Sequence, residues 1–238
     1  MTFTVAGLVG NPRSGSKTHA TTVALVDRLV DALAPLGAVR GQVTDLAEFG
    51  GRVLDPTDQE LAELRTSLTH IRLLVVATPV YKGSYTGLLK AFLDGYGPGA
   101  LERTATVPLT IAASPQHALA GSTHLHPLLI ELGSVSPAGA LAIPDAYTAD
   151  IERRDAVLDA WVADRLPFLA AAAAFGEPAV PAEQRASASA FAPAPAPPPP
   201  TPTASAPPTP TAIASASTAT SATTTTHTDL DTSGSSND

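Results

Sequence analysis

Apolar residues follow two spacings in turn along residues 3–175, and this alternation restricts the fold more than any other feature of the chain. Short apolar runs, typical of buried strands, occur at 3–9, 39–43, 71–77, 107–113 and 140–143. Between them, apolar residues recur at helical spacing over 23–33, 55–68, 88–93, 125–132 and 151–175. Parallel strands need crossovers of this kind, so the sequence predicts one parallel sheet with helices on both faces.

Loops 10–18, 78–87 and 113–117 each follow the carboxyl end of a predicted strand. Right-handed crossovers bring these ends to one edge of a parallel sheet. Ligands of such sheets bind beyond this edge, where the strand order reverses. All three loops are rich in residue types that contact ligands, so we expect one ligand site built from them.

The first loop, Gly10–Thr18, carries polar groups suited to a terminal monophosphate. Its charged and hydroxyl side chains are those of Arg13, Ser14, Ser16, Lys17 and Thr18. The helix that follows offers unpaired N–H groups and partial positive charge at its N-terminus. Three hydroxyls and two cations match a group that brings about two negative charges.

Other interpretations of this loop fit the residues less well. The triphosphate-binding pattern G-x-x-x-x-G-K-[ST] is broken because Ser16 separates Gly15 from Lys17. The dinucleotide pattern G-x-G-x-x-G fails because position 12 is proline. An ordinary capped turn, with Ser16 as the helix N-cap, remains the alternative to phosphate binding.

The second loop, Thr78–Gly87, is suited to a flat ring. Proline and glycine restrict its path, and Tyr81 and Tyr85 can pack against an aromatic system. Its successive backbone N–H groups can reach ring carbonyls and nitrogens. The alternative is a rigid loop whose tyrosines only cover the end of the sheet.

Composition restricts the class of protein further. The formal net charge is −8, which argues against a nucleic-acid partner, and the chain has no cysteine for disulfides or thiolate metal sites. We see no signal peptide and no membrane span, so we expect a cytoplasmic protein without a membrane partner. Residues 177–238 are rich in Ala, Pro, Ser and Thr and lack the apolar residues of a core, so we expect a disordered tail.

Three segments resemble the NAD(P)H-dependent FMN reductase family, which includes the reductase components of alkanesulfonate and related sulfur-scavenging monooxygenase systems. They are 10–18, 77–90 (ATPVYKGSYTGLLK) and 114–129, which begins SPQHALA. The resemblance covers residues 3–175. It implies a flavodoxin-like fold with a five-stranded parallel sheet of order 2-1-3-4-5, a reductase domain over 1–176, and a homodimer or homotetramer.

The resemblance also implies which residues contact the cofactor. It assigns the FMN phosphate to Arg13, Ser16 and Thr18, and the ring and ribityl chain to Pro79, Val80, Tyr81, Lys82, Gly83 and Ser84. Ser14 and Ser114 complete our candidate list, which contains no catalytic residue and no metal ligand. Relatives often have glycines where this chain has Ala112-Ala113-Ser114, and the alanine methyls narrow the expected pocket.

The predicted reaction is hydride transfer from NADPH or NADH to FMN, with the reduced flavin supplied to a partner flavin-dependent monooxygenase. Hydride transfer between stacked nicotinamide and flavin rings requires few side-chain groups, so the protein mainly supplies a flat binding slot and orients the two rings. Two alternatives remain: a quinone, azo or metal-ion reductase with tightly bound FMN, and a non-enzymatic flavodoxin-like electron carrier. Electron carriers need an acidic docking face, whereas loop 78–87 is neutral to basic.

One helix is expected to be irregular. In the family, the helix around His124 can carry an extra-residue bulge at the subunit interface that affects flavin exchange. This chain lacks the tyrosine that strongly flavin-transferring relatives carry there, and Pro127 predicts a bend because it removes a helix hydrogen bond.

Overall fold

A computed structural model describes residues 2–174, and the predictions for residues 175–238 lie outside the described residues. The strands and helices are β1 Phe3–Val9, α1 Lys17–Leu33, β2 Ala38–Asp45, α2 Gln59–Leu68, β3 Leu73–Pro79, α3 Gly87–Leu93, β4 Ala105–Ala112, α4 His126–Glu131, β5 Leu141–Pro144, α5 Asp145–Thr148 and α6 Ile151–Ala174. Short 3-10 turns occur between several of these elements.

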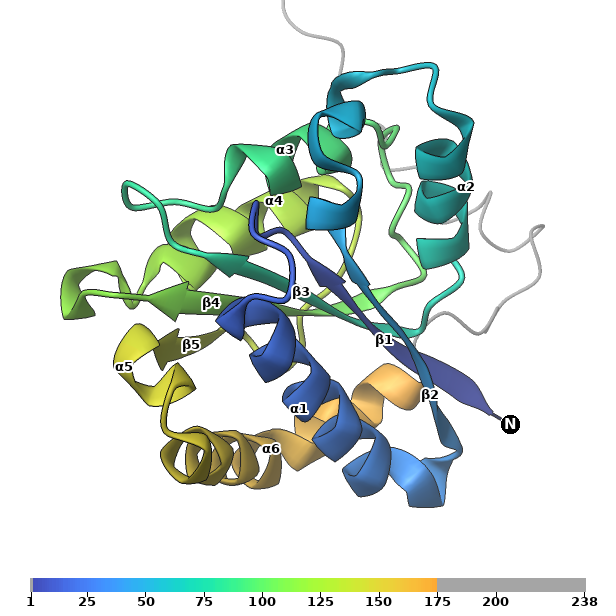
Figure 1. The fold of residues 1–238 in the computed structure, drawn as a ribbon. Helices are drawn as coiled ribbons and strands as arrows, with labels where there is room; N and C mark the ends of the chain where they lie inside the picture. The colour runs from blue at the N-terminus through green and yellow to red at the C-terminus, as the bar shows by residue number, and fades with distance from the viewer. Residues whose placement is uncertain (1, 175–238) are drawn as a thin grey trace, which may run out of the picture. The chain divides into compact units, whose positions relative to one another are not determined.

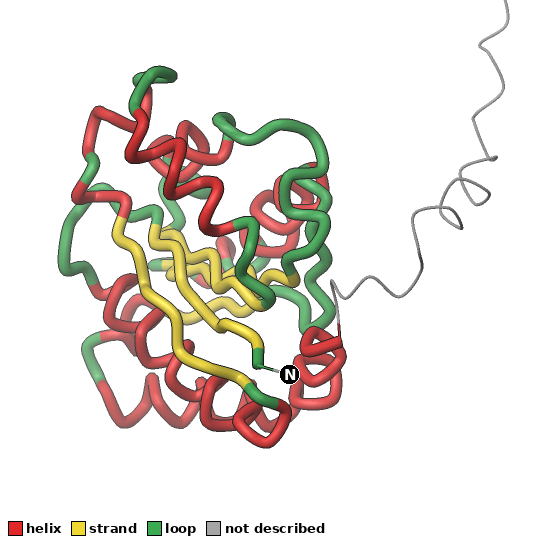
Figure 2. Tube along the Cα trace, turned by 90° about the vertical axis from the view of Figure 1, so that its right-hand side faces the viewer, coloured by secondary structure: helices red, strands yellow, loops and turns green. Residues whose placement is uncertain are grey.

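The five strands form one parallel sheet in the order β2-β1-β3-β4-β5, as predicted. Helices α1 and α6 cover one face, and α2, α3 and α4 cover the other (Figure 1). Figure 2 shows the strands between these two helical layers. The flavodoxin-like architecture is therefore confirmed.

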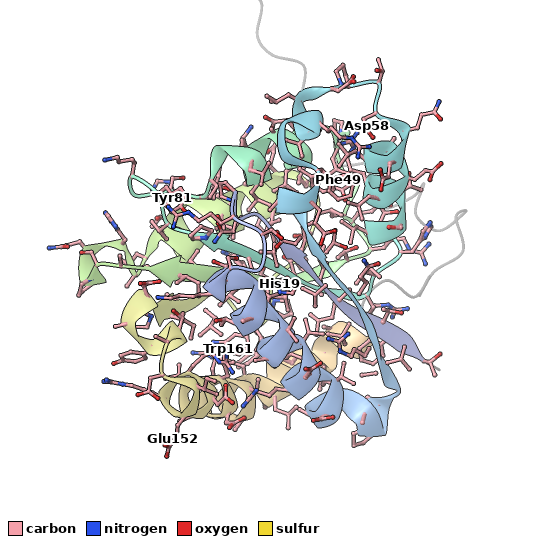
Figure 3. All side chains as sticks on the ribbon, in the orientation of Figure 1. His19, Phe49, Asp58, Tyr81, Glu152 and Trp161 are labelled. Carbon is pink, nitrogen blue, oxygen red and sulfur yellow. The ribbon has the colours of Figure 1, made fainter. Side chains whose placement is uncertain are left out.

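Two apolar cores, one on each face, hold the sheet between its helices. In β3, Val75 points into the core with α1 and α6, whereas the next residue, Val76, points into the core with α2 and α3. Trp161 packs against the first core from α6 (Figure 3). A strand with apolar residues on both faces loses its alternating pattern, which explains the uninterrupted apolar run at 73–77 that follows Arg72.

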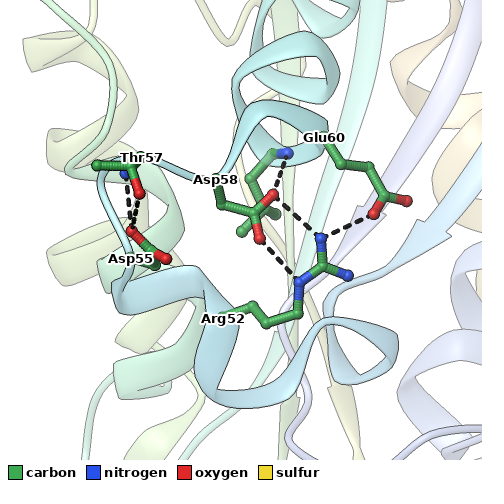
Figure 4. Close-up of polar contacts among 6 residues, drawn as sticks. Arg52, Asp55, Thr57, Asp58 and Glu60 are labelled. Atoms are coloured by element: carbon green, nitrogen blue, oxygen red, sulfur yellow. Dashed lines mark hydrogen bonds and ion pairs between the residues drawn. The ribbon is translucent and has the colours of Figure 1, made fainter.

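Helix α2 begins later than the sequence predicts, and polar contacts around Asp58 explain the difference (Figure 4). Asp58 caps α2 by accepting a backbone N–H of its first turn at 3.1 Å. Arg52 donates to Asp58 at 2.8 and 3.1 Å and to Glu60 at 2.8 Å, and its hydrogen bond lowers the pKa of Asp58. Asp55, the predicted starting residue, instead accepts two hydrogen bonds from Thr57 in the preceding turn.

The segment after β4 differs from a regular helix. A π-helix spans Gly121–Leu125 and leads directly into α4. Gly121 lies close to the sheet, where an added Cβ would stand 3.2 Å from Ala140 Cβ and 3.2 Å from Thr110 Oγ1. Pro127 lies in the first turn of α4, where a missing N–H is tolerated. The expected irregularity of this helix is therefore present, in the form of a π-helix over residues that include no tyrosine.

Candidate functional site

A cavity of about 540 Å³ lies at the carboxyl edge of the sheet. Its walls come from the loop after β1 and from the ends of β3, β4 and β5. The lining residues are Asn11, Arg13, Ser14, Gly15, Ser16, Lys17, Thr18, Pro79, Val80, Tyr81, Ile111, Ala113 and Asp145. A second cavity of about 290 Å³ lies at the opposite edge, before β3 and β4, and is lined by Thr69, His70, Arg72, Gly99, Ala100, Glu102 and Arg103.

The hydroxyl groups of the first loop have unequal surroundings. Ser16 caps α1, because its Oγ accepts the His19 N–H at 3.2 Å. Thr18 is buried, and its Oγ1 accepts a hydrogen bond from Asn11 Nδ2 at 3.1 Å. Ser14 is exposed and lines the cavity without a hydrogen bond that would fix its hydroxyl to the described residues. The alternating spacing of the three hydroxyls therefore does not make them equivalent ligands.

Two buried residues that sequence reasoning left off the candidate list hold this loop in place. Asn11 Oδ1 accepts the Arg13 N–H at 3.0 Å, in addition to the contact of its amide with Thr18. Asp45, at the end of β2, accepts the Gly15 N–H at 3.3 Å. Gly15 has a φ of 60°, which favours glycine. The position of Asp45 directly after a predicted strand was the available signal.

Thr86 joins the first loop to the second. Its Oγ1 donates to the carbonyl of Gly10 and accepts the Leu89 N–H at 3.2 Å, which caps α3. Its own N–H donates to Thr78 Oγ1 at 3.2 Å. Gly10 packs so closely that an added Cβ would lie 2.4 Å from Leu89 Cβ. The two loops therefore form one packed unit at the edge of the sheet.

The second loop ends in a tight hairpin. Tyr81 and Ser84 exchange backbone hydrogen bonds of 2.9 and 3.2 Å across Lys82 and Gly83. Both central residues have positive φ, 53° for Lys82 and 84° for Gly83, as a type I′ turn requires. Lys82 is the one non-glycine residue with positive φ among residues 2–174. This conformation costs about 1–2 kcal/mol for a residue with a side chain.

The structure gathers seven of the eleven candidate residues around the larger cavity. They are Arg13, Ser14, Ser16, Thr18, Pro79, Val80 and Tyr81. Tyr81 is 45% exposed beside the hairpin (Figure 3). The remaining candidates, Lys82, Gly83, Ser84 and Ser114, are not among the lining residues, and Ser114 Oγ donates to Gln116 instead.

The cavity also contains residues that the candidate list lacked. Lys17 Nζ lies 3.6 Å from Asp145 Oδ2, and this ion pair joins the start of α1 to the start of α5. Ala113 lines the cavity, as expected from the family difference at 112–114. Asp145 was missed although it follows the fifth predicted strand, because only the first, third and fourth strand ends were considered.

Within residues 2–174 no helix is long and apolar enough to cross a membrane, and no three His, Asp or Glu residues gather as metal ligands would. The sheet order and the cavity at the reversal between β1 and β3 define a flavodoxin-like protein with a ligand site at its strand switch point.

Residues 3–148 match the model of the family described as NADPH-dependent FMN reductase, and the chain belongs to that family. It is 36% identical to an FMN reductase (NADPH) of Pseudomonas aeruginosa over 53% of this chain and 68% of the relative. It is 35% identical to the NADH-dependent FMN reductase SfnF of Pseudomonas fluorescens over 72% of this chain and 91% of the relative. The apo structure of an NADH:FMN oxidoreductase (EMOB) superimposes with a TM-score of 0.55 and 25% identity. The match covers 70% of this chain and 90% of the chain in that structure.

These relationships confirm the predicted class. The protein is an NAD(P)H:FMN oxidoreductase, of a family that uses FMN with NADPH or NADH.

Removing the hydroxyl that joins the two loops will destabilise the fold. Thr86→Val leaves the buried Gly10 carbonyl without its partner and removes the cap of α3, so we expect a loss of about 2 kcal/mol in the free energy of unfolding. Urea denaturation measures this change in the free energy of unfolding. Thr66→Val, which removes an exposed helical hydroxyl, is the matched control and should change stability little. Equal stabilities for the two variants would contradict the assigned role.

Replacing Lys82 with a residue that tolerates positive φ will remove backbone strain and stabilise the protein. Lys82→Asn places a residue that tolerates positive φ before Gly83, so we expect a gain of about 0.5–1 kcal/mol. Lys82→Ala removes the same charge but keeps the strain, so its stability should stay near that of the wild type. Thermal denaturation of the three proteins tests this; a stabilising Lys82→Ala would assign the effect to charge instead.

Proposed function

We propose that the larger cavity binds FMN, with the phosphate over residues 13–18 and the ring against residues 79–84. The observation that carries this proposal is the joining of both loops around one cavity of about 540 Å³. Volumes of about 300–1,000 Å³ are usual for small-molecule sites. The residues fit a cofactor with one charged end and one flat end.

The phosphate end is supported by the start of α1. This helix has 17 residues, and its first turn contains no acidic side chain, so its N-terminal partial charge favours an anion. Arg13 and Lys17 line the cavity at this end. No ion pair engages Arg13 within residues 2–174, so its guanidinium is available to bind the phosphate.

The ring end is supported by the second loop. Pro79, Val80 and Ile111 give the cavity an apolar wall, and Tyr81 adds an aromatic side chain. We place the flavin against this wall, with Lys82 and Gly83, the two central residues of the hairpin, offering backbone N–H groups to its polar edge. The turn at Lys82 and Gly83, where both φ values are positive, reverses the chain within two residues and keeps the loop short.

When bound, FMN would supply the hydride acceptor for the reduced nicotinamide. The chain contributes by holding the phosphate, orienting the ring against Pro79 and Val80, and keeping water from one face. The rigid joining of the loops through Thr86 holds the ring at a fixed position. No side chain needs to move a proton in this account, so we assign no catalytic acid or base.

We further propose that reduced FMN leaves the protein and serves a partner flavin-dependent monooxygenase in the cytoplasm. The relatives described as NADH-dependent FMN reductases support FMN as the substrate. We propose residues 1–176 as the reductase domain and a homodimer or homotetramer as the assembly. Exposed apolar side chains near α4, such as Leu119 and Ile130, support an assembly surface there.

Arg13 tests the proposed phosphate contact. With the full chain, Arg13→Ala should raise the KM for FMN about tenfold or more in anaerobic NADPH or NADH oxidation at 340 nm, because a charge-assisted contact is lost. The value of kcat should stay within about twofold. Riboflavin, which lacks the phosphate, should be reduced equally by both proteins.

Arg40→Ala, at a surface arginine paired with Asp27, is the matched control. An unchanged KM for FMN in Arg13→Ala would place the phosphate elsewhere. A chain that purifies with bound FMN and reduces quinones without added flavin would favour the tightly bound alternative.

A further inference from the structure

Asp145 is a carboxylate in the part of the cavity that the FMN phosphate would enter. It begins α5 directly after β5, and both Asp145 and Lys17 line the cavity. The separation of 3.6 Å between Nζ and Oδ2 is longer than a hydrogen bond, and both side chains are about half exposed. Exposed ion pairs of this kind are weak, so Lys17 can exchange Asp145 for another anion.

The charges around the loop are balanced before any ligand enters. Arg13 and Lys17 contribute two positive charges to the lining, and Asp145 contributes one negative charge. Asp45, buried behind the loop, adds a second negative charge and occupies the Gly15 N–H. A phosphate dianion therefore meets no excess of side-chain positive charge at this end of the cavity.

We infer that Asp145 weakens the binding of FMN by competing with its phosphate for Lys17, and so keeps FMN exchangeable. This inference rests on the proposed function. Helix N-termini commonly receive an acidic side chain, and α1 has none in its own first turn. Asp145 instead pairs from another element with the side chain of Lys17, the first residue of α1, and acts as an internal competitor of the phosphate. It is a positioning residue, because it acts through Lys17.

The consequence concerns the mode of catalysis. An FMN whose phosphate must displace a carboxylate binds less tightly and leaves more readily than one that meets free cations. Loss of the competitor would slow the release of FMN and shift the balance towards a retained flavin. The same loss would leave riboflavin unaffected, because riboflavin has no phosphate to compete for Lys17.

Asp145→Asn tests the inference by removing the charge while keeping the size of the side chain. In fluorescence titrations of the full chain at low salt, we expect the Kd for FMN to fall about five- to tenfold and the Kd for riboflavin to stay unchanged. The difference should shrink at high ionic strength because salt screens exposed charges. Asp145→Glu keeps the charge and should bind FMN nearly as the wild type does.

Two further variants test whether the charge of Asp145 acts only within the cavity and whether it acts through Lys17. Asp164→Asn removes the same charge from α6, outside the cavity lining, and should leave both affinities unchanged. In a Lys17→Met background, Asp145→Asn should lose most of its effect, because the residue that it frees is gone. A full effect in that background would overturn competition for Lys17.

Three outcomes would overturn the inference. If Asp145→Asn leaves the Kd for FMN unchanged while the wild type prefers FMN to riboflavin, the competition fails and the proposed function stands. If FMN and riboflavin tighten equally, Asp145 acts on the ring end or on the fold. If the wild type does not distinguish the two flavins, the proposed phosphate site fails and the inference with it.

Discussion

The close packing of Gly10 against Leu89, closed by the hydroxyl of Thr86, is the contact on which the site depends. Gly10 continues the ladder of β1 and β3 through its N–H, which donates to Ala77 at 2.8 Å, and its carbonyl binds Thr86. The absence of a side chain at Gly10 lets α3 start directly beside the first loop. This contact joins loop 10–18 to loop 78–87 and places both around one cavity.

A parallel sheet was predictable from the residues because its inner strands β1, β3 and β4 are buried along most of their length. Residues 73–77 are all apolar, and residues 107–113 contain Thr110 as their one polar residue, so neither run alternates as a half-exposed strand would. A parallel sheet between two helical layers buries such strands. The order itself came from the family resemblance carried by residues 77–90. The phosphate-type loop was visible because its glycines and hydroxyls are adjacent in sequence.

Features that depend on distant contacts were harder to predict. The roles of Asp45 and Asp145 follow from the meeting of four strand ends, and neither lies near the recognised segments. The hairpin at Lys82 escaped notice because lysine is unusual at positive φ and the usual Asn-Gly signal is missing. Helix α2 starts at Asp58 rather than Asp55 because the carboxylate of Asp55 is engaged by Thr57.

The loops around the site are rigid, whereas the ion pair within it is weak. Backbone and hydroxyl contacts fix the loops, whereas the exposed ion pair between Lys17 and Asp145 is easily exchanged. A frame of this kind orients a ring for hydride transfer without holding the cofactor strongly. Under the proposed function, this arrangement would suit a flavin that enters oxidised and leaves reduced.

A crystal structure of the FMN complex tests the central claim most directly. The account predicts the phosphate within hydrogen-bond distance of Arg13 and the N-terminal turn of α1, with the ring against Pro79, Val80 and Tyr81. FMN bound instead in the cavity lined by His70, Arg72 and Arg103, at the opposite edge of the sheet, would contradict it.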